Sequence, residues 1–147
     1  MILELQEKLH NEIPMTKLMQ LKIKKYDNKN LQTTAPLNIN VNDKGTAFGG
    51  SLSTITIISA WSMCWLLVKE LNIDSKNIVV IKNENSYLKP VTNDIECFTK
   101  KPSEEEISIL KKKLERKESA SIKIESKIIQ NKETCVQFNG VYVIKKE

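Results

Sequence analysis

The chain of 147 residues has one histidine, His10, and one arginine, Arg116, although 28% of its residues are charged. Because His10 lies alone in a charged N-terminal segment, we expect neither a Ser-His-Asp or Cys-His arrangement nor a histidine-ligated metal site. Specific nucleic-acid readers rely on arginine forks, and the few aromatic residues here do not alternate with a basic stripe. We therefore expect no nucleic-acid partner, no metal and no other cofactor.

Cysteine is also scarce. Cys64, Cys97 and Cys135 are odd in number and do not have the spacing of metal ligands, which favours reduced, buried thiols in a cytoplasmic protein. A catalytic cysteine is disfavoured because the sequence offers no partner base for it. No secretory signal is visible, since charged residues begin at Glu4. The expected location is therefore the cytoplasm.

The charges that are present are mostly positive. Of the 23 basic residues all but Arg116 are lysine, and the net charge is +5. A lysine-rich surface can steer an acidic partner by long-range attraction, and ordinary solubilising lysines are the alternative. The length predicts one domain spanning residues 1–147, large enough to bury a core without disulfides or metal.

A long segment without any charge interrupts this pattern. From Gly45 to Val68 there is no Asp, Glu, Lys or Arg. The segment is long enough to raise the question of a membrane span, but its first two-thirds are rich in serine and threonine. We interpret residues 49–71 as a helix that is apolar nearly all round and forms the core of a globular fold, and we expect no membrane span.

The remaining patterns predict strands that cover this helix. Leu5 and Leu9, spaced four apart, indicate an amphipathic helix over 2–12 that is broken at Pro14, and a capping box indicates a surface helix from Ser103. Strands are expected over 21–26, 31–37, 77–88 (with a buried start at 78–81), 94–100, 120–130 and 135–144, the last two forming an antiparallel hairpin. The expected fold class is α+β, with an antiparallel curved sheet of five or six strands wrapped around one long central helix.

The segment just before the central helix is the most informative one. It reads Asn40-Val41-Asn42-Asp43-Lys44-Gly45-Thr46-Ala47-Phe48-Gly49-Gly50-Ser51. A glycine-rich turn that opens a buried helix directs free backbone N–H groups into a pocket, and glycine lets a ligand approach the backbone closely. This arrangement suits an enzyme that stabilises an oxyanion.

At these residues the chain resembles the hotdog-fold thioesterase superfamily. Within it, the chain is most similar to the bacterial thioesterase-like family found alone or fused behind an acetyltransferase domain, with members assigned malonyl-acyl-carrier-protein decarboxylase activity. The matching residues are Asn40-x-Asn42-x-x-Gly45-Thr46-x-Phe48-Gly49-Gly50-Ser51, Trp61-x-Met63-x-Trp65-Leu66, Tyr87-Leu88-Lys89-Pro90-Val91-Thr92 and Gln137-Phe138-x-Gly140-x-Tyr142-Val143. The resemblance implies a homodimer, or a higher homo-oligomer, with sheets joined edge to edge and an acyl-thioester site between protomers.

The resemblance also assigns roles to residues. Asn42 falls on the position of the catalytic amide, and Gly49 and Gly50 fall on the oxyanion-hole positions. Thr46, Phe48, Ser51, Glu84 and Tyr87 are expected to bind substrate. Alternatives remain open: Asn42 as a turn residue in left-handed geometry, Thr46 and Ser51 as helix caps, and Phe48 as a core residue.

The expected substrate is an acyl thioester of acyl carrier protein or coenzyme A. Hotdog hydrolases commonly carry an acid early in the central helix to activate water, but here the first acid in the helix is Glu70. Glu84 is the remaining base candidate. Decarboxylation of a malonyl thioester needs no base, so we favour a malonyl decarboxylase that supplies the acetyl primer of fatty-acid biosynthesis. A thioesterase and a non-catalytic acyl-binding module are the alternatives.

Overall fold

A computed structural model describes residues 1–75 and 77–146 of the chain. All the helices and strands expected from the sequence are present in it, with boundaries that differ by at most a few residues. Their bounds are α1 Ile2–Glu12, α2 Pro14–Leu18, β1 Lys22–Tyr26, β2 Asn30–Ala35, α3 Gly49–Glu70, β3 Asn77–Tyr87, β4 Ile95–Lys100, α4 Glu104–Arg116, β5 Ser119–Gln130 and β6 Glu133–Lys145.

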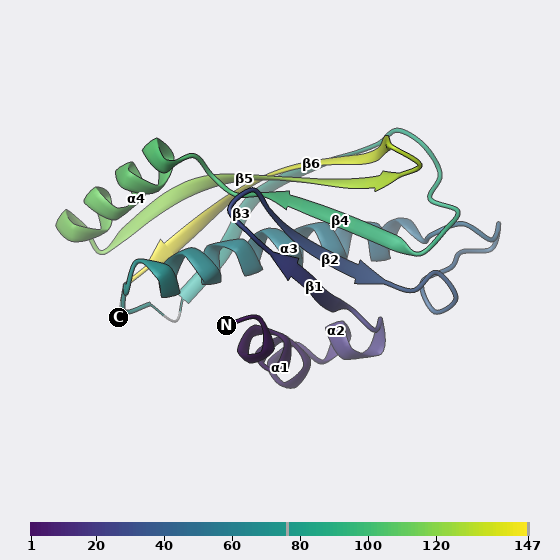
Figure 1. Ribbon diagram of the computed structural model, residues 1–147, viewed down its shortest axis with the longest axis horizontal. Coiled ribbons are helices and arrows are strands. Elements are labelled where there is room, and N and C mark those ends of the chain that lie inside the picture. The colour runs from purple at the N-terminus through teal and green to yellow at the C-terminus, as the bar shows by residue number, and fades with distance from the viewer. Residues whose placement is uncertain (76, 147) are drawn as a thin grey trace.

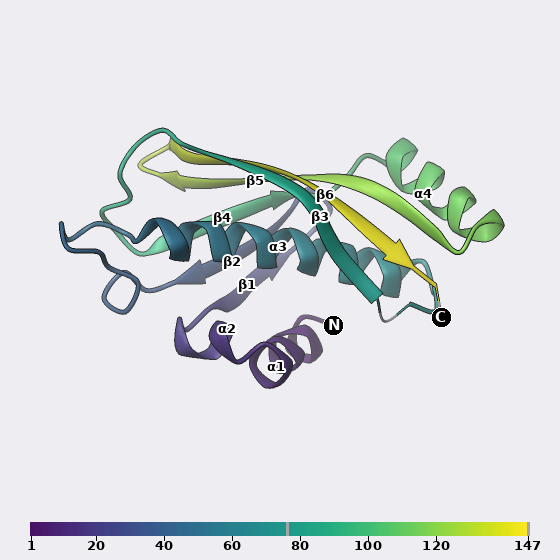
Figure 2. The same cartoon turned by 180° about the vertical axis from the view of Figure 1, so that it is seen from behind.

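The six strands form one antiparallel sheet in the order β1-β2-β4-β5-β6-β3. The sheet curves over α3, while α1 and α2 lie on the other side of that helix and α4 lies beside the start of β5 (Figures 1 and 2). This is the α+β arrangement predicted from the sequence, and it leaves β1 and β3 as the two edges of the sheet.

The helix α3 is the core of the molecule. By length and composition it could cross a membrane, with a mean hydropathy of 1.6 over its most apolar window, but 67% of that window is buried inside the fold. Its second half is buried on all sides from Ser62 to Val68. In its first half Ser53, Ile57 and Trp61 stay partly exposed along one stripe. The expectation of a buried core helix is thus confirmed, with one side of the first half left open.

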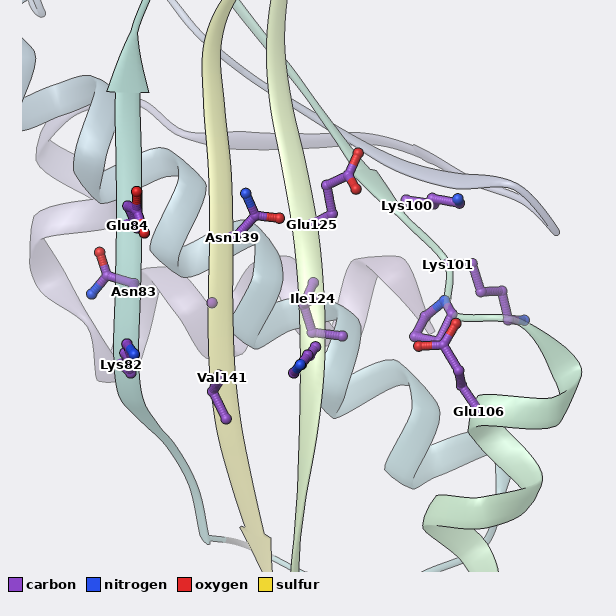
Figure 3. A pocket seen from close by; sticks show the side chains of 13 residues that line it. Lys82, Asn83, Glu84, Lys100, Lys101, Glu106, Ile124, Glu125, Asn139 and Val141 are labelled. Carbon is purple, nitrogen blue, oxygen red and sulfur yellow. The ribbon is translucent and has the colours of Figure 1, made fainter.

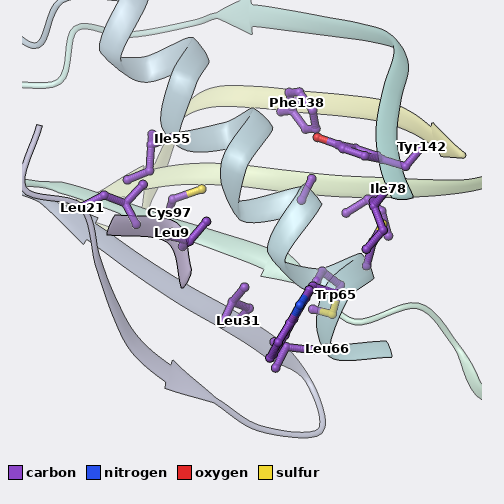
Figure 4. Close-up of a cluster of buried hydrophobic side chains, with 14 of the residues drawn as sticks. Leu9, Leu21, Leu31, Ile55, Trp65, Leu66, Ile78, Cys97, Phe138 and Tyr142 are labelled. Carbon is purple, nitrogen blue, oxygen red and sulfur yellow. The ribbon is translucent and has the colours of Figure 1, made fainter. Parts of the chain in front are cut away.

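Large side chains of β6 fix the helix against the sheet (Figure 4). The Tyr142 hydroxyl donates to the carbonyl of Ile57 at 2.6 Å, and Phe138 is fully buried nearby. Gly140 lies between these two residues, and a Cβ there would come within 2.7 Å of the Phe138 ring. A side chain at position 140 would therefore displace the two aromatic rings.

A buried cluster of hydroxyl groups joins α3 to three strands, and nothing in the sequence pattern predicted it. The Oγ1 of Thr33 on β2 lies 2.6 Å from the Oγ of Ser59 on α3, and the Oγ1 of Thr99 on β4 lies 2.7 Å from the Oγ of Ser126 on β5. All four residues are fully buried. They surround Cys97, whose pKa is raised to about 11 because burial disfavours the thiolate.

The β3 strand departs from the prediction at its start. A buried run over 78–81 was expected, but only Ile78 is buried, while Val79 and Ile81 are exposed at 46% and 61%. The reason is that β3 is an edge strand whose outer side has no partner among the described residues. A bulge between Val80 and Lys82 also makes Ile81 an extra residue in the pairing with β6.

Short local motifs account for the turn between β5 and β6 and for the start of α4. Asn131 and Lys132 both have positive φ, of 52° and 64°, which suits the two-residue turn that joins β5 and β6. At the start of α4 the capping box is present, since Ser103 and Glu106 each bond the backbone N–H of the other. Both features confirm predictions made from short sequence motifs.

The hydroxyl cluster predicts a stability change. Replacing Ser126 by Ala leaves the buried Thr99 hydroxyl without its partner, and we expect the free energy of unfolding to fall by about 1–3 kcal/mol. Urea denaturation at neutral pH measures this. The control is Ser121→Ala on the same strand, where the side chain is exposed and the change should be below about 0.5 kcal/mol. Equal effects of the two substitutions would contradict this interpretation of the cluster.

Candidate functional site

The turn before α3 is built around the side chain of Asn42. Its Oδ1 accepts hydrogen bonds from the backbone N–H groups of Lys44 at 2.8 Å and Thr46 at 3.1 Å. Its Nδ2 donates to the Oγ1 of Thr46 at 2.9 Å and lies 3.5 Å from the carbonyl oxygen of Ala47. Asn42 does not have a positive φ; Gly45 does, at 80°, so the left-handed alternative for Asn42 is wrong and the left-handed residue of the turn is the glycine.

Asn40, two residues earlier, has a different environment. It is 3% exposed, and its side-chain oxygen accepts a hydrogen bond from the Ser51 hydroxyl at 2.8 Å. Its Nδ2 donates to the carbonyl oxygens of Met19 at 3.0 Å and Pro36 at 2.8 Å. The backbone carbonyl of Asn40 accepts from the N–H of Phe48 at 2.7 Å. Asn40 belongs to the motif before α3, but two asparagines at this spacing do not show from the sequence which one points inward.

The helix α3 begins without a cap. Its N-cap residue is Phe48, whose side chain cannot accept a hydrogen bond. The alternative of Thr46 and Ser51 as caps is wrong, because their hydroxyls bond to Asn42 and Asn40 instead. The backbone N–H groups of Gly49 and Gly50 find no acceptor in residues 1–75 and 77–146. Two donors at the positive end of a 22-residue helix therefore remain available to a ligand.

The space around these two glycines is unequal. A Cβ added at Gly49 would meet no atom within 4 Å, whereas one added at Gly50 would overlap the ring of Phe48. The Phe48 side chain is 54% exposed, so it is not the core residue considered as one alternative. It lies over Gly50 and forms one side of the helix start, next to a shallow apolar cavity of about 410 Å³ that Leu18 and Ile39 also line.

The structure separates Glu84 from this region. Glu84 pairs with Asn139 on β6, and both point from the face of the sheet opposite α3, beside Lys82 and Glu125 (Figure 3). Its neighbour Asn85 points the other way, and its Nδ2 lies 3.3 Å from the Oγ1 of Thr56 on α3.

The bulge in β3 explains why Glu84, expected near the site, faces away from the helix. Alternation counted from the buried Ile78 would put every second residue, including Glu84, on the side of α3. The extra residue at Ile81 reverses the alternation, so that the odd-numbered residues after it face the helix. Tyr87 lies at the end of β3 and is exposed at 55%. The chain after it returns to the helix start, where the Ala47 N–H donates to the Val91 carbonyl at 2.8 Å.

The helix start has little charge around it. Asp43 and Lys44, the nearest charged residues in sequence, have exposed side chains and face each other at 3.5 Å. Burial raises the pKa of the Cys64 thiol, which disfavours a thiolate nucleophile in the helix. Among residues 1–75 and 77–146, no group of three His, Cys, Asp or Glu side chains could hold a metal ion. The available chemistry is hydrogen bonding from neutral donors beside an apolar surface.

Comparison with known proteins agrees with this geometry. Residues 2–146 match the model of the YiiD_C family, described as "Putative thioesterase (yiiD_Cterm)". The chain belongs to this family. The match covers both the turn around Asn42 and the glycine pair, so the thioesterase-like hotdog assignment made from the sequence is confirmed at the level of the superfamily.

Solved structures show the same fold. A protein of unknown function from Chlorobaculum tepidum is 36% identical, with a TM-score of 0.92, and the match covers 98% of this chain and 93% of that one. A "putative thioesterase" from Shewanella oneidensis is 31% identical, with a TM-score of 0.89, and the match covers 98% of this chain and 96% of that one. A "probable thioesterase" from Pseudomonas aeruginosa is 17% identical, with a TM-score of 0.74 and coverage of 100% and 97%, and shows the fold alone.

The open space at Gly49 leads to a stability prediction. Gly49 is in a helical conformation with room for a methyl group, so Gly49→Ala should raise the free energy of unfolding by up to about 1 kcal/mol. Gly45→Ala is the matched control, since it has equal room but a φ of +80°, and it should destabilise the protein. Urea denaturation of both variants tests this. A loss of stability in Gly49→Ala similar to that in Gly45→Ala would show that the helix start is not as open as described.

Proposed function

We propose that the protein is an acyl-thioester enzyme that decarboxylates a malonyl thioester, with the start of α3 as its oxyanion site. The observation that carries this proposal is the pair of N–H groups at Gly49 and Gly50, which find no acceptor among the described residues. A helix start normally has such donors capped, and leaving out the cap costs about 1 kcal/mol. A function at this position accounts for that cost.

The reaction requires charge stabilisation and little else. The bond between the malonyl carboxylate carbon and the α-carbon breaks, CO₂ leaves, and the electron pair moves into the thioester as an enolate. The N–H groups of Gly49 and Gly50 donate to the enolate oxygen, and one donor of this kind is worth roughly 3 kcal/mol of barrier. A proton from water then adds to the α-carbon and gives the acetyl thioester, the primer for fatty-acid biosynthesis.

The lack of an acid in the first turns of α3 favours this reaction over hydrolysis. Hydrolysis needs a base for the attacking water, and α3 has no acid before Glu70. Glu84 points from the opposite face of the sheet. The thioesterase name of the family favours the alternative, hydrolysis of an acyl thioester, and the product of the reaction distinguishes the two.

Asn42 is the proposed side-chain donor. Of its two N–H groups, one donates to Thr46 at 2.9 Å, while the other has only the carbonyl of Ala47 at 3.5 Å, the limit of a hydrogen bond. This second N–H can turn to a substrate without loss of the two bonds that the Asn42 oxygen accepts in the turn. Thr46, Phe48, Ser51 and Tyr87 remain proposed substrate-binding residues.

A second copy of the chain is the proposed partner at the β3 edge. An unpaired edge strand of eleven residues with exposed Val79 and Ile81 invites pairing with another strand. Exposed apolar side chains continue from β3 to the α3 start through Tyr87, Leu88 and Phe48. Antiparallel pairing of two β3 strands would cover this surface and join the sheets edge to edge. We propose a homodimer; a tetramer would need a further surface.

The carrier of the acyl group is proposed to be acyl carrier protein or coenzyme A, because both bring acidic groups to a surface of net charge +5. The proposed compartment is the cytoplasm, in keeping with three buried cysteines that are all free thiols.

The product of turnover tests the reaction. Malonyl-acyl carrier protein incubated with the enzyme should give acetyl-acyl carrier protein and CO₂. Mass spectrometry of the carrier protein measures this conversion. Release of malonate and free carrier thiol would instead show hydrolysis, and saturable binding without turnover would show an acyl-binding module.

Two variants test the residues in the same assay. Asn42→Asp keeps the oxygen that accepts from Lys44 and Thr46 but has no N–H donors, so turnover should fall by about 10²-fold or more if the amide donates to substrate. Gly49→Ala should also lose turnover, because its methyl group enters the oxyanion space of a protein that is at least as stable. Full activity of Asn42→Asp would limit Asn42 to its part in the turn.

The β3 edge predicts a change in molecular mass. Ile81→Glu places a charge on the proposed interface, and we expect the variant to sediment as a monomer of 16.8 kDa where the wild type sediments as a dimer. Ile109→Glu is the control, because Ile109 is exposed at 47% on α4, away from β3. A monomeric wild type, or a dimer that survives Ile81→Glu, would rule out pairing at this edge.

A further inference from the structure

Asn40 has the most constrained polar side chain near the helix start. It is 3% exposed, and every hydrogen-bonding group on both its side chain and its backbone has a short contact. Its Nδ2 bonds the carbonyls of Met19 at the end of α2 and Pro36 after β2. The Nδ2 of Asn40 thus connects the end of α2 to the segment after β2.

The two carbonyl oxygens of Asn40, one on its side chain and one on its backbone, bond to the start of α3. Its Oδ1 accepts from the Ser51 hydroxyl at 2.8 Å, and its backbone carbonyl accepts from the Phe48 N–H at 2.7 Å. Phe48 and Ser51 flank Gly49 and Gly50 in the sequence. The residues on both sides of the glycine pair are therefore held by one buried residue, Ser51 by the Asn40 side chain and Phe48 by the Asn40 backbone, while the pair itself has no acceptor among the described residues.

The Ser51 hydroxyl shows what this arrangement prevents. A serine in the first turn of a helix commonly bonds to nearby backbone groups, and such bonds compete for the N–H groups of the helix start. Because Asn40 accepts from Ser51, the hydroxyl is directed away from Gly49 and Gly50. An oxyanion site needs the N–H groups of Gly49 and Gly50 to be oriented and unoccupied. Asn40 helps to keep them so because it gives the Ser51 hydroxyl a fixed acceptor elsewhere.

We propose that Asn40 is a positioning residue of the thioester site, which orients the start of α3 through Ser51 and Phe48 without touching substrate. This inference rests on the proposed function, since it assigns Asn40 to the same reaction. Asn40 is suited to this position because a carboxamide combines two donors with an acceptor. An aspartate of equal size has no N–H and would face the carbonyls of Met19 and Pro36 with lone pairs.

The experiment compares Asn40→Asp and Ser51→Ala with Ser126→Ala, which loses a hydrogen bond of the same kind in the distant hydroxyl cluster. We expect kcat for malonyl-acyl carrier protein to fall at least about tenfold in the first two, a part of the 10²–10³ that loss of one oxyanion donor costs. In Asn40→Asp, where the changed side chain does not touch substrate, affinity for acetonyl-coenzyme A, a thioether that cannot lose CO₂, should stay near the wild-type value. Ser126→Ala should keep its kcat, and Ser51→Thr should recover much of the loss by restoring the hydroxyl.

An amide spectrum gives a readout that does not depend on activity. In ¹H–¹⁵N correlation spectra, the Gly49 and Gly50 signals should shift in Ser51→Ala and Asn40→Asp and remain in place in Ser126→Ala. Unshifted glycine signals, or an unchanged kcat in Ser51→Ala, would overturn the positioning role. If Asn40→Asp does not fold, Ser51→Ala decides the matter alone. If the wild type turns over no thioester, the proposed function fails, while the glycine signals still test whether Asn40 orients the helix start.

Discussion

The fold depends on an apolar helix whose first N–H groups must be exposed at one end of the core. A helix without charge from Gly49 to Val68 is stable only when the sheet covers it, and the sheet covers it by curving. Burial of such a helix is strongly favourable, whereas its uncapped start is unfavourable on its own. The turn of residues 40–48 meets both conditions. It brings polar side chains to the helix start and bonds them to one another, so that the amides of the glycine pair have no acceptor among the described residues.

Much of this could be predicted because the signals were local. The alternation of β5 and β6, the capping box at Ser103 and Glu106, and the uncharged run of α3 each depend on neighbours within a few residues. The glycine turn before α3 was recognised for the same reason, through the spacing of Gly45, Gly49 and Gly50. The family model matches residues 2–146, a span that includes these glycines.

The errors arose where one residue changed the direction of many side chains. Glu84 was expected near the site, but the bulge at Ile81 puts it on the face of the sheet opposite α3, and a bulge has no sequence signature here. The two asparagines of the turn were equally hard to tell apart. Asn40 points into the core and Asn42 into its own turn, a difference that depends on the carbonyl of Pro36 and on that of Met19, which is distant in the sequence. The hydroxyl cluster around Cys97 was missed because its members lie on four different elements.

The positions of the three cysteines allow local and global unfolding to be measured by thiol alkylation. Cys64 lies in the central helix, Cys97 in a middle strand and Cys135 near a hairpin end, and each is at most 2% exposed. An alkylating reagent can reach such thiols only when the surrounding structure separates. The rate at which each sulfur is modified therefore reports the free energy of unfolding of the structure around it. The three native cysteines distinguish local fraying of the hairpin from unfolding of the core.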